Sequence, residues 1–492
     1  YELGYREGNL SPTASQDLTA FINACHDKGI RIFLDVVLGF MKEEPYRRIA
    51  FDVFYLENPE KHPTDPDAFT SRKGGGREFR NAFGASCPRY VNTNITTYNP
   101  ISDKVENISP ARQHMLTFLT RWMEDFQIDG IRMDSVENVA NWDFIRDFKD
   151  SAREQFKQRY PAAGGATDAK FLVVGEELEM PPELLSGERP RLDGLWNERF
   201  QGLVRAALIG ENVDGLNFED TVRRAIDCRI EKVFDDGARA INYLTSHDVE
   251  GKRKERLYNF MVATVSLASS EPLFDRGAIE TQVRDSIRRD GREPEPEEVR
   301  NRASQIILHR ARLRRIKLGF VCLLTAVGIP MILAGEEFAD QHELFDSRGN
   351  VTHQGGKQVD PVNFSRFDEP DRRDVFDYDR KLVQLRTSHP ALSVNDTDFI
   401  HVDFNDGKRV LVWKRGTDND PVVVVANFSD FTTANALSPG AEYFTPNWPK
   451  TPAGRHWFEV TQSRHVKTGR HDRESIFAWE AKVYRLEPGD NF

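Results

Sequence analysis

Apolar residues alternate between two patterns up to about residue 395. In segments 16–28 and 112–126 they recur every third or fourth position, which predicts amphipathic helices. Segment 30–37 is a nearly continuous apolar run rich in β-branched residues, which predicts a strand buried on both faces. The same helix–strand arrangement recurs where the second helix leads into a strand at 128–133. Further runs of the second kind occupy 171–174, 192–196, 240–244 and 331–334. Repeated helix–strand units with buried strands indicate an α/β fold built on a parallel sheet.

The pattern changes after a last helical segment at 377–386. Short apolar runs bounded by Gly, Asp, Asn and Pro follow it, which predicts the antiparallel strands of a β-sandwich. These runs are 410–414, 422–427 and 481–486. We therefore expect two domains, a larger α/β domain over 1–395 and a β-sandwich domain over 396–492.

Two segments interrupt the alternation of helices and strands. Residues 41–110 are rich in Pro, Asn, Gly and Thr, so we expect an irregular loop excursion, a kind of segment in which functional residues gather. Residues 276–315 are dense in Arg and Glu. This composition favours a solvated helical hairpin or a mobile insert over a binding patch.

Acidic residues stand at the ends of several predicted strands. Asp134, Glu176 and the pair His247 and Asp248 each follow such an apolar run. In a (β/α)8 barrel the carboxyl ends of the strands form the active-site face. A doubly wound sheet also binds ligands at its strand ends, but no GxGxxG motif follows any of the predicted strands. We therefore predict a (β/α)8-type TIM barrel followed by a C-terminal antiparallel β-sandwich.

Asp134 and Glu176 end consecutive predicted strands, so both would project into one barrel mouth. Cleavage of a glycosidic bond with retention needs two carboxyl groups about 5–5.5 Å apart, one to attack the anomeric carbon and one to protonate the leaving oxygen. Taken alone, an acid at a strand end is more often a loop cap or a helix cap. On spacing alone, both interpretations stay open.

Four local sequences resemble, in order and approximate spacing, the motifs of the α-amylase superfamily, glycoside hydrolase family 13. They are Ile32-Phe-Leu-Asp-Val-Val, Gly130-Ile-Arg-Met-Asp134, Val174-Gly-Glu176 and Ser246-His247-Asp248. Two downstream segments, 328–337 and 382–392, resemble the eighth barrel strand with its loop and the last barrel helix. The resemblance covers about residues 10–395, and its strength lies in the ordered set rather than in any one motif.

The resemblance implies a role for each motif residue. Asp134 would be the nucleophile, Glu176 the general acid/base, and Asp248 the residue that holds and distorts the sugar at the cleavage point. His247 would hydrogen-bond the sugar. Arg132 would lie beside the nucleophile and keep it ionised, whereas Glu176 must remain protonated as it donates.

The first motif departs from the family pattern, in which Asp-Val-Val is followed by X-Asn-His. Here Asp35-Val-Val-Leu is followed by Gly39 and Phe40. The Asn is usually a calcium ligand in the family, so we expect no metal or other cofactor. The His usually contacts the sugar, so Phe40 would offer only an apolar or stacking surface. We count Asp35, a candidate ion-pair partner of Arg132, and Phe40 among the substrate-binding residues.

Residues 1–15 resemble the stretch that follows the second barrel strand in the family. No sequence here corresponds to the first two barrel strands. We therefore expect a barrel that lacks its first strands in this chain, with an exposed sheet edge, and either an N-terminal extension of the protein or a fragment.

Composition narrows the class of partner. The balance of 67 Lys+Arg against 78 Asp+Glu gives a net charge of −11, which argues against nucleic acid or an anionic membrane as the main partner. No apolar run reaches the roughly 18 residues of a membrane span. The four cysteines lack CxxC spacing, which favours free thiols over a disulfide framework or a zinc site, and the chain starts without a signal-peptide pattern. We expect a cytoplasmic protein whose partner is a neutral α-glucan oligo- or polysaccharide.

These observations predict a retaining glycoside hydrolase acting on α-1,4 or α-1,6 glucosidic bonds of starch- or glycogen-type glucans through a covalent glucosyl-enzyme intermediate. Two alternatives stay open: an α-glucanotransferase or 1,4-α-glucan branching enzyme, and a non-catalytic glucan-binding relative. The intact set of three carboxylates favours an enzyme over a binding module. An unrelated metal-dependent barrel would need a His/Asp cluster, which His26, His114 and His247 do not form in sequence.

Overall fold

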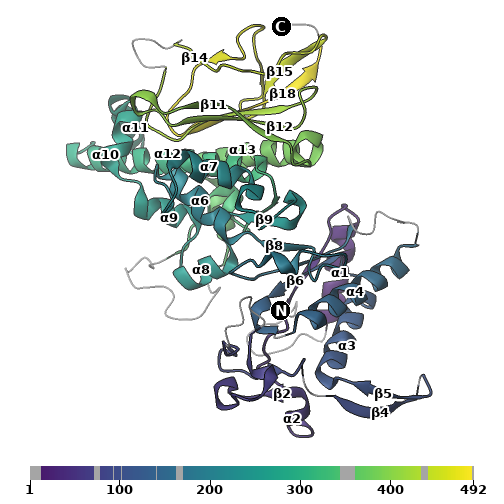
Figure 1. Cartoon of the computed structure of the whole chain (residues 1–492). Coiled ribbons are helices and arrows are strands. Elements are labelled where there is room, and N and C mark those ends of the chain that lie inside the picture. Colours follow the sequence, from purple (N-terminus) through teal and green to yellow (C-terminus); the bar gives the residue numbers. More distant parts are fainter. Residues whose placement is uncertain are drawn as a thin grey trace. The chain divides into compact units, whose positions relative to one another are not determined.

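The computed structural model of the chain describes residues 13–70, 78–91, 94–100, 102–139, 141–161, 170–343, 361–433 and 441–489. It divides into two compact units, Tyr1–Trp196 (unit 1) and Asn197–Phe492 (unit 2), and each is described by itself (Figure 1). This division falls inside the predicted larger domain, and the predicted boundary between residues 395 and 396 stays a prediction. Most of segment 1–15, with its expected place after a second barrel strand, lies outside the described residues.

Unit 1 is built on parallel strands in the order β1-β6-β7-β8. The strands are β1 (Phe33–Val37), β6 (Gly130–Asp134), β7 (Leu172–Gly175) and β8 (Gly194–Trp196), and the accompanying helices are α1 (Ala14–His26), α3 (Pro110–Glu124) and α4 (Trp142–Arg159). In α3 the buried Met115, Leu119 and Met123 recur every four residues, so one face of the helix supplies core contacts. The predicted helix–strand units are confirmed.

Strand β1 differs from the prediction of burial on both faces. It pairs with β6 on one side, and the described residues place no strand on its other side. Phe33 and Val37 are accordingly 42% and 45% exposed. Residues Gly130–Met133 of β6, with a strand on each side, are all buried as predicted.

The excursion at 41–110 contains more regular structure than predicted. It carries α2 (Phe51–Phe54), the paired short strands β2 (Tyr55–Leu56) and β3 (Cys87–Pro88), and a hairpin of β4 (Ile95–Asn99) and β5 (Lys104–Ile108). The hairpin is absent from the prediction because it offers no buried run: its apolar residues Ile95 and Val105 are 40% and 69% exposed. The prediction of a purely irregular loop is therefore wrong for residues 95–108.

Unit 2 begins with helices around a pair of parallel strands, β9 (Ala240–Tyr243) and β10 (Ile329–Met331). The helices of this part are α6 (Glu198–Leu208), α7 (Phe218–Ile226), α8 (His247–Arg253), α9 (Leu257–Thr264), α10 (Leu267–Ser270), α11 (Arg276–Arg289), α12 (Pro296–Thr325) and α13 (Pro370–Ser388). Its core centres on the C-terminal half of α12, where Ile316, Phe320 and Leu324 are buried.

The charged segment 276–315 folds as α11 followed by the first part of α12. Two small apolar clusters join the helices, one around Ile279 and Ile307 and the other around Val283 and Val299. Its charges form local ion pairs such as Arg276 with Glu280. The predicted helical hairpin is confirmed.

The C-terminal part of unit 2 is an antiparallel sheet in the order β11-β12-β13-β18-β15-β16, which lies over α7, α12 and α13 in Figure 1. Its strands are β11 (Thr397–Asp403), β12 (Val410–Arg415), β13 (Val422–Asn427), β15 (Arg455–Glu459), β16 (Arg464–His465) and β18 (Glu480–Pro488), and a second small sheet pairs β14 (Tyr443–Phe444) with β17 (Arg473–Glu474). Leu411 and Trp413 join the helical core, whereas Val410 and Val412 join a second core with Tyr443. This alternation produces the predicted sandwich.

Candidate active site

The strand ends of unit 1 bring the predicted acids together. Arg132 and Asp134 are two residues apart on β6 and therefore project from the same face. In the parallel register with β1, Asp35 lies directly opposite Arg132. The backbone N–H of Glu176 donates to Met133 O at 2.9 Å, which fixes the end of β7 beside the end of β6.

Gly175 is required where it precedes Glu176. A Cβ at this position would lie 2.6 Å from Leu192 Cδ1 and 2.8 Å from Val136 Cγ2, closer than carbon atoms approach without displacement. Any larger residue would push the end of β7 away from its neighbours. The adjacent Glu177 is 2% exposed, and it is Glu176, as predicted, that joins the acidic cluster.

Arg132 is the centre of that cluster. Its Nη1 donates to Asp35 Oδ1 and to Asp134 Oδ1, at 2.8 Å each, and its Nη2 donates to Glu176. Arg132 is only 7% exposed, so water competes little for these bonds. One guanidinium therefore holds carboxylates from three neighbouring strands or their ends, and the predicted Arg132–Asp35 ion pair is present.

The electrostatics of the cluster follow from this crowding. Burial lowers the pKa of Arg132, but attraction to Glu176, Asp35 and Asp134 outweighs burial, so the pKa lies above its ordinary value. The Arg132 Cζ lies 4.2 Å from the ring centre of Trp196, whose face attracts the cation. When all three acids are ionised, three negative charges surround one positive charge. The surplus can stabilise positive charge that develops on a bound molecule.

The spacing of the two central acids decides what they can do together. A carboxylate oxygen of Asp134 and one of Glu176 lie within 4.8 Å of each other. Retaining glycosidases separate their carboxyl groups by about 5–5.5 Å, whereas inverting enzymes need about 6.5–9.5 Å to admit a water molecule. The spacing therefore suits direct attack by one carboxylate and proton transfer by the other.

Gly39 and Phe40, which replace the family's Asn-His, lie in a loop organised by Arg80. A Cβ on Gly39 would lie 2.8 Å from Asn138 Cβ, so this close approach excludes an asparagine side chain. Phe40 packs edge-on against Phe83, with ring centres 5.2 Å apart. The buried Arg80 donates to four backbone carbonyl oxygens, those of Gly39, Asp67, Pro88 and Asn138. The Arg80 guanidinium thus provides hydrogen-bond donors for the carbonyl groups around Gly39. The expected lack of a metal cofactor stays a prediction.

The remaining predicted residues, His247 and Asp248, start helix α8 in unit 2. The Ser246 side chain accepts a hydrogen bond from Val249 N and caps the helix. His247 Nε2 lies 3.7 Å from Asp248 Oδ2, and their side chains are 31% and 16% exposed. The two residues are therefore neighbours at a strand-to-helix turn. Their placement beside Asp134 and Glu176 stays a prediction.

The buried Arg205 anchors the same turn. Its Nη2 donates to Thr245 Oγ1 at 2.8 Å and its Nε donates to Leu244 O at 3.1 Å. These bonds fix the residues between β9 and α8, so His247 and Asp248 start from a rigid base. The sequence offered no signal for this role, because Arg205 lies on α6, far from the motif.

Two further roles were not predicted. The ring of Trp196 contacts Arg132. Arg80 lies in the excursion that was predicted to be irregular, and no motif marks it. In both cases the signal is a tertiary contact, which a single sequence does not display.

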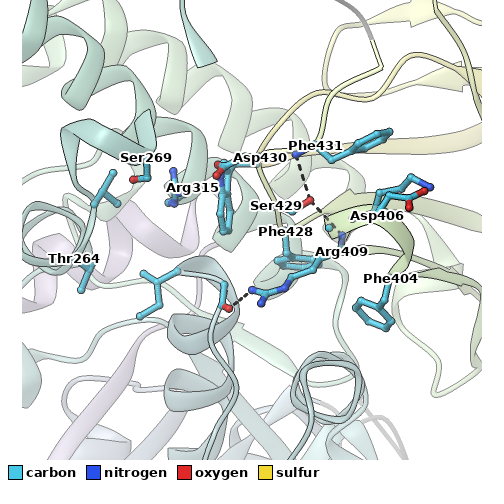
Figure 2. Close-up of a pocket in the computed structure, with 16 residues that line it drawn as sticks. Thr264, Ser269, Arg315, Phe404, Asp406, Arg409, Phe428, Ser429, Asp430 and Phe431 are labelled. Atoms are coloured by element: carbon cyan, nitrogen blue, oxygen red, sulfur yellow. Dashed lines mark hydrogen bonds between the residues drawn. The ribbon is translucent and has the colours of Figure 1, made fainter. Parts of the chain in front are cut away.

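Unit 2 also contains a cavity of about 770 Å³ between helices and the antiparallel sheet, drawn in Figure 2. Arg315, Arg409, Phe404 and Trp479 are among the residues that line it. It includes none of the predicted site residues, and we assign it no chemistry.

Among the described residues, no helix combines the length and apolar character needed to cross a membrane.

Comparison with known proteins places these observations in context. No family profile matches the chain. It is 23% identical over 435 residues to alpha-amylase MalA of Haloarcula japonica, covering 87% of this chain and 47% of that protein. It is 21% identical over 419 residues to a cyclomaltodextrinase of Geobacillus thermopakistaniensis, covering 84% of this chain and 54% of that protein. The chain thus spans about half the length of these curated relatives.

Comparison with a solved structure bears on the fold. The alpha-amylase of Geobacillus thermoleovorans, complexed with acarbose, superposes with a TM-score of 0.55 at 17% identity, covering 98% of this chain and 83% of that one. The parallel strands with their helices and the antiparallel C-terminal sheet are therefore those of a (β/α)8-type barrel with a C-terminal β-sandwich. The resemblance that the four motifs indicate is confirmed.

Proposed function

We propose that this relative of the α-amylase superfamily is a retaining glycoside hydrolase that cleaves α-1,4 glucosidic bonds of starch- or glycogen-type glucans. One observation carries the proposal: Asp134 and Glu176, on adjacent strand ends, share the Arg132 guanidinium with carboxylate oxygens within 4.8 Å of each other. That spacing supports a double displacement rather than inversion. The named relatives, an alpha-amylase and a cyclomaltodextrinase, support an α-glucan substrate.

In the first step Asp134 attacks the anomeric carbon of the bound sugar. Arg132 favours this step because its Nη1 donates a hydrogen bond to Asp134 Oδ1 and so holds the attacking carboxylate in place. Glu176 protonates the departing glycosidic oxygen, so the bond breaks without releasing an alkoxide. The products of this step are a glucosyl ester on Asp134 and a shortened glucan.

In the second step Glu176, now a carboxylate, takes a proton from water as the water attacks the anomeric carbon and the Asp134 carboxylate leaves. Two displacements at one carbon restore the α configuration. The ion pair between Arg132 and Glu176 bears on this cycle, since the guanidinium favours the charged form of Glu176 that the second step needs. Protonation of Glu176 before the first step would require a bound sugar to displace that contact.

His247 and Asp248 would complete the site by binding sugar hydroxyl groups. Their position at the start of α8, with partly exposed side chains, leaves them accessible to a ligand. Phe40 and Asp35 would contribute further contacts, because Phe40 offers an apolar ring and Asp35 has a side chain that is 49% exposed. The proposed partner is an α-glucan oligo- or polysaccharide.

Product analysis tests this function. The full chain would be incubated with maltoheptaose, amylose and pullulan, and the length and anomeric form of the products followed by chromatography and NMR. Shorter products released as α anomers support the hydrolase, and cleavage of pullulan would add α-1,6 bonds to its range. The Asp134→Asn variant, prepared in parallel, controls for contaminating amylases.

Other outcomes redirect the proposal. Products longer than the starting maltoheptaose, or new branch points, would identify a glucanotransferase or branching enzyme that uses the same two carboxylates. Binding of amylose without any product would favour a non-catalytic relative. Release of β anomers would contradict the retaining mechanism outright.

A further inference from the structure

Three metal-ligating side chains converge on the C-terminal sheet of unit 2, apart from every residue used above. His456 lies on β15, His465 on β16 and Glu487 on β18. One ligand atom from each residue lies within 4.8 Å of the other two. His456 Nε2 is 2.8 Å from His465 Nδ1 and 3.9 Å from Glu487 Oε2.

The antiparallel register holds these groups in place. His456 pairs directly with Glu487 across the β15–β18 ladder. On the other side, His465 pairs with Phe458, which is two residues from His456 and on the same face. The three side chains therefore extend from the same face of three neighbouring strands, and their convergence follows from the sheet rather than from a flexible loop.

Neighbouring contacts orient the ligand atoms further. Arg485 donates to Glu487 Oε1 at 2.5 Å, which leaves Oε2 as the oxygen nearest to His456. His456 is only 4% exposed, and a Cβ added to Gly489 would lie 3.3 Å from its ring. His465 is exposed, so an ion could enter from solvent. The cluster is therefore buried at His456 and open to solvent at His465.

We propose that His456, His465 and Glu487 bind one Zn²⁺ ion, with water as the fourth ligand. Two imidazole nitrogens and one carboxylate oxygen form a ligand set suited to zinc, whereas Ca²⁺ and Mg²⁺ need a larger number of oxygen ligands. Zinc–nitrogen bonds of about 2.0–2.1 Å in a tetrahedral site place neighbouring ligand atoms roughly 3.3 Å apart. The distances of 2.8 Å and 3.9 Å lie on either side of that value.

The ion would take the place of the proton that now lies between the two imidazoles. For both rings to bind zinc while neutral, His456 must carry its proton on Nδ1 and His465 on Nε2. No covalent or redox step is involved. The bound ion would join the edge strand β16 to β15 and β18 and so stabilise that edge of the sheet.

Calorimetric titration of the tag-free full chain with zinc chloride tests the proposal, since a histidine tag would itself bind zinc. The chain is first freed of metal with a chelator, and the pH is set about one unit above the ordinary imidazole pKa of about 6.5. We expect one Zn²⁺ per chain with micromolar or tighter affinity, and a rise in Tm of roughly 3 °C at saturation. Mg²⁺ and Ca²⁺ should produce neither effect.

Variants separate this site from other metal-binding groups. His465→Ala, at an exposed position where folding should be unaffected, should weaken zinc binding at least about 10-fold, and Glu487→Gln should also weaken it. Two controls should retain full binding: His62→Ala, an exposed histidine in unit 1, and Asp134→Asn, which removes a carboxylate of the candidate active site. Equal zinc affinity in His465→Ala and the wild type, or no saturable binding, would overturn the proposal and leave a plain histidine–histidine hydrogen bond.

Discussion

Among the described residues of unit 1, two guanidinium groups are buried, and their surroundings are opposite. Arg132, on β6, contacts three carboxylates, whereas Arg80, in the loop excursion, donates to four neutral carbonyl oxygens. Burial lowers the pKa of Arg80, while the pKa of Arg132 is raised because its acidic partners outweigh burial. An arginine that donates to buried carbonyl oxygens stabilises the fold. An arginine surrounded by more negative charge than it neutralises lies in a site that can stabilise positive charge on a bound molecule.

This contrast predicts that changes around Arg132 affect catalysis, and that changes at Arg80 affect stability. The largest effect should come from Asp134→Asn. Without the nucleophile, kcat should fall at least about 10⁴-fold, because an amide cannot form the ester intermediate. Initial rates on maltoheptaose measure the loss, and circular dichroism checks the fold. The matched control is Asp143→Asn on α4, whose side chain is 64% exposed, and which should keep the wild-type rate.

Replacing the shared cation should have the next largest effect on catalysis. In Arg132→Met the carboxylates of Asp134 and Glu176 lose their common partner and repel each other, so kcat/KM should fall about 10²- to 10³-fold. The comparison is with Arg189→Met, a surface arginine whose side chain is 68% exposed. Steady-state kinetics of both variants decide the point, since equal activity would show that Arg132 only supports the fold.

Arg80→Met should lower the stability of the protein rather than the activity of its folded form. Four buried carbonyls lose their donors, so the free energy of unfolding should fall by about 3 kcal/mol. Chemical denaturation measures this change against Arg47→Met, whose side chain is 56% exposed and whose loss should leave the stability nearly unchanged. The folded fraction of Arg80→Met should stay active. A stable but inactive variant would contradict the structural role assigned to Arg80.

The smallest effect should come from the ring beneath Arg132. Trp196→Phe keeps an aromatic face but weakens its attraction for the cation, and we expect a 2- to 3-fold decrease in kcat/KM, about 0.5 kcal/mol. Trp142→Phe changes another ring that lies under an arginine, Arg191 at 5.3 Å, whose Nη1 donates to the backbone oxygen of Glu183. It should leave the rate unchanged, and similar losses in both variants would remove the special role of Trp196.

Sequence reasoning predicted the parts of this site that repeat a local pattern. Strand β6 ends with an acid and strand β7 is directly followed by one, so the positions of Asp134 and Glu176 follow from the sequence. The ion pair between Arg132 and Asp35 was also expected, and the register of β1 and β6 explains it. These features depend on neighbours in sequence or on adjacent strands.

What the sequence did not predict depends on contacts between distant segments. Arg80 gathers carbonyls from residues up to 58 positions away, and no local pattern encodes that set. The hairpin of β4 and β5 was missed because its apolar residues face solvent. Burial of β1 on both faces was predicted wrongly, because an apolar run does not tell a central strand from an edge strand.

Trapping the intermediate on Asp134 tests the central claim most directly. In Glu176→Gln, α-maltosyl fluoride can still react, because fluoride leaves without proton transfer, whereas hydrolysis of the ester lacks its general base. Peptide mass spectrometry of the digested protein should then find one maltosyl unit on the peptide that contains Asp134. An unmodified Asp134 peptide together with steady release of maltose, or a label on another residue, would contradict the account.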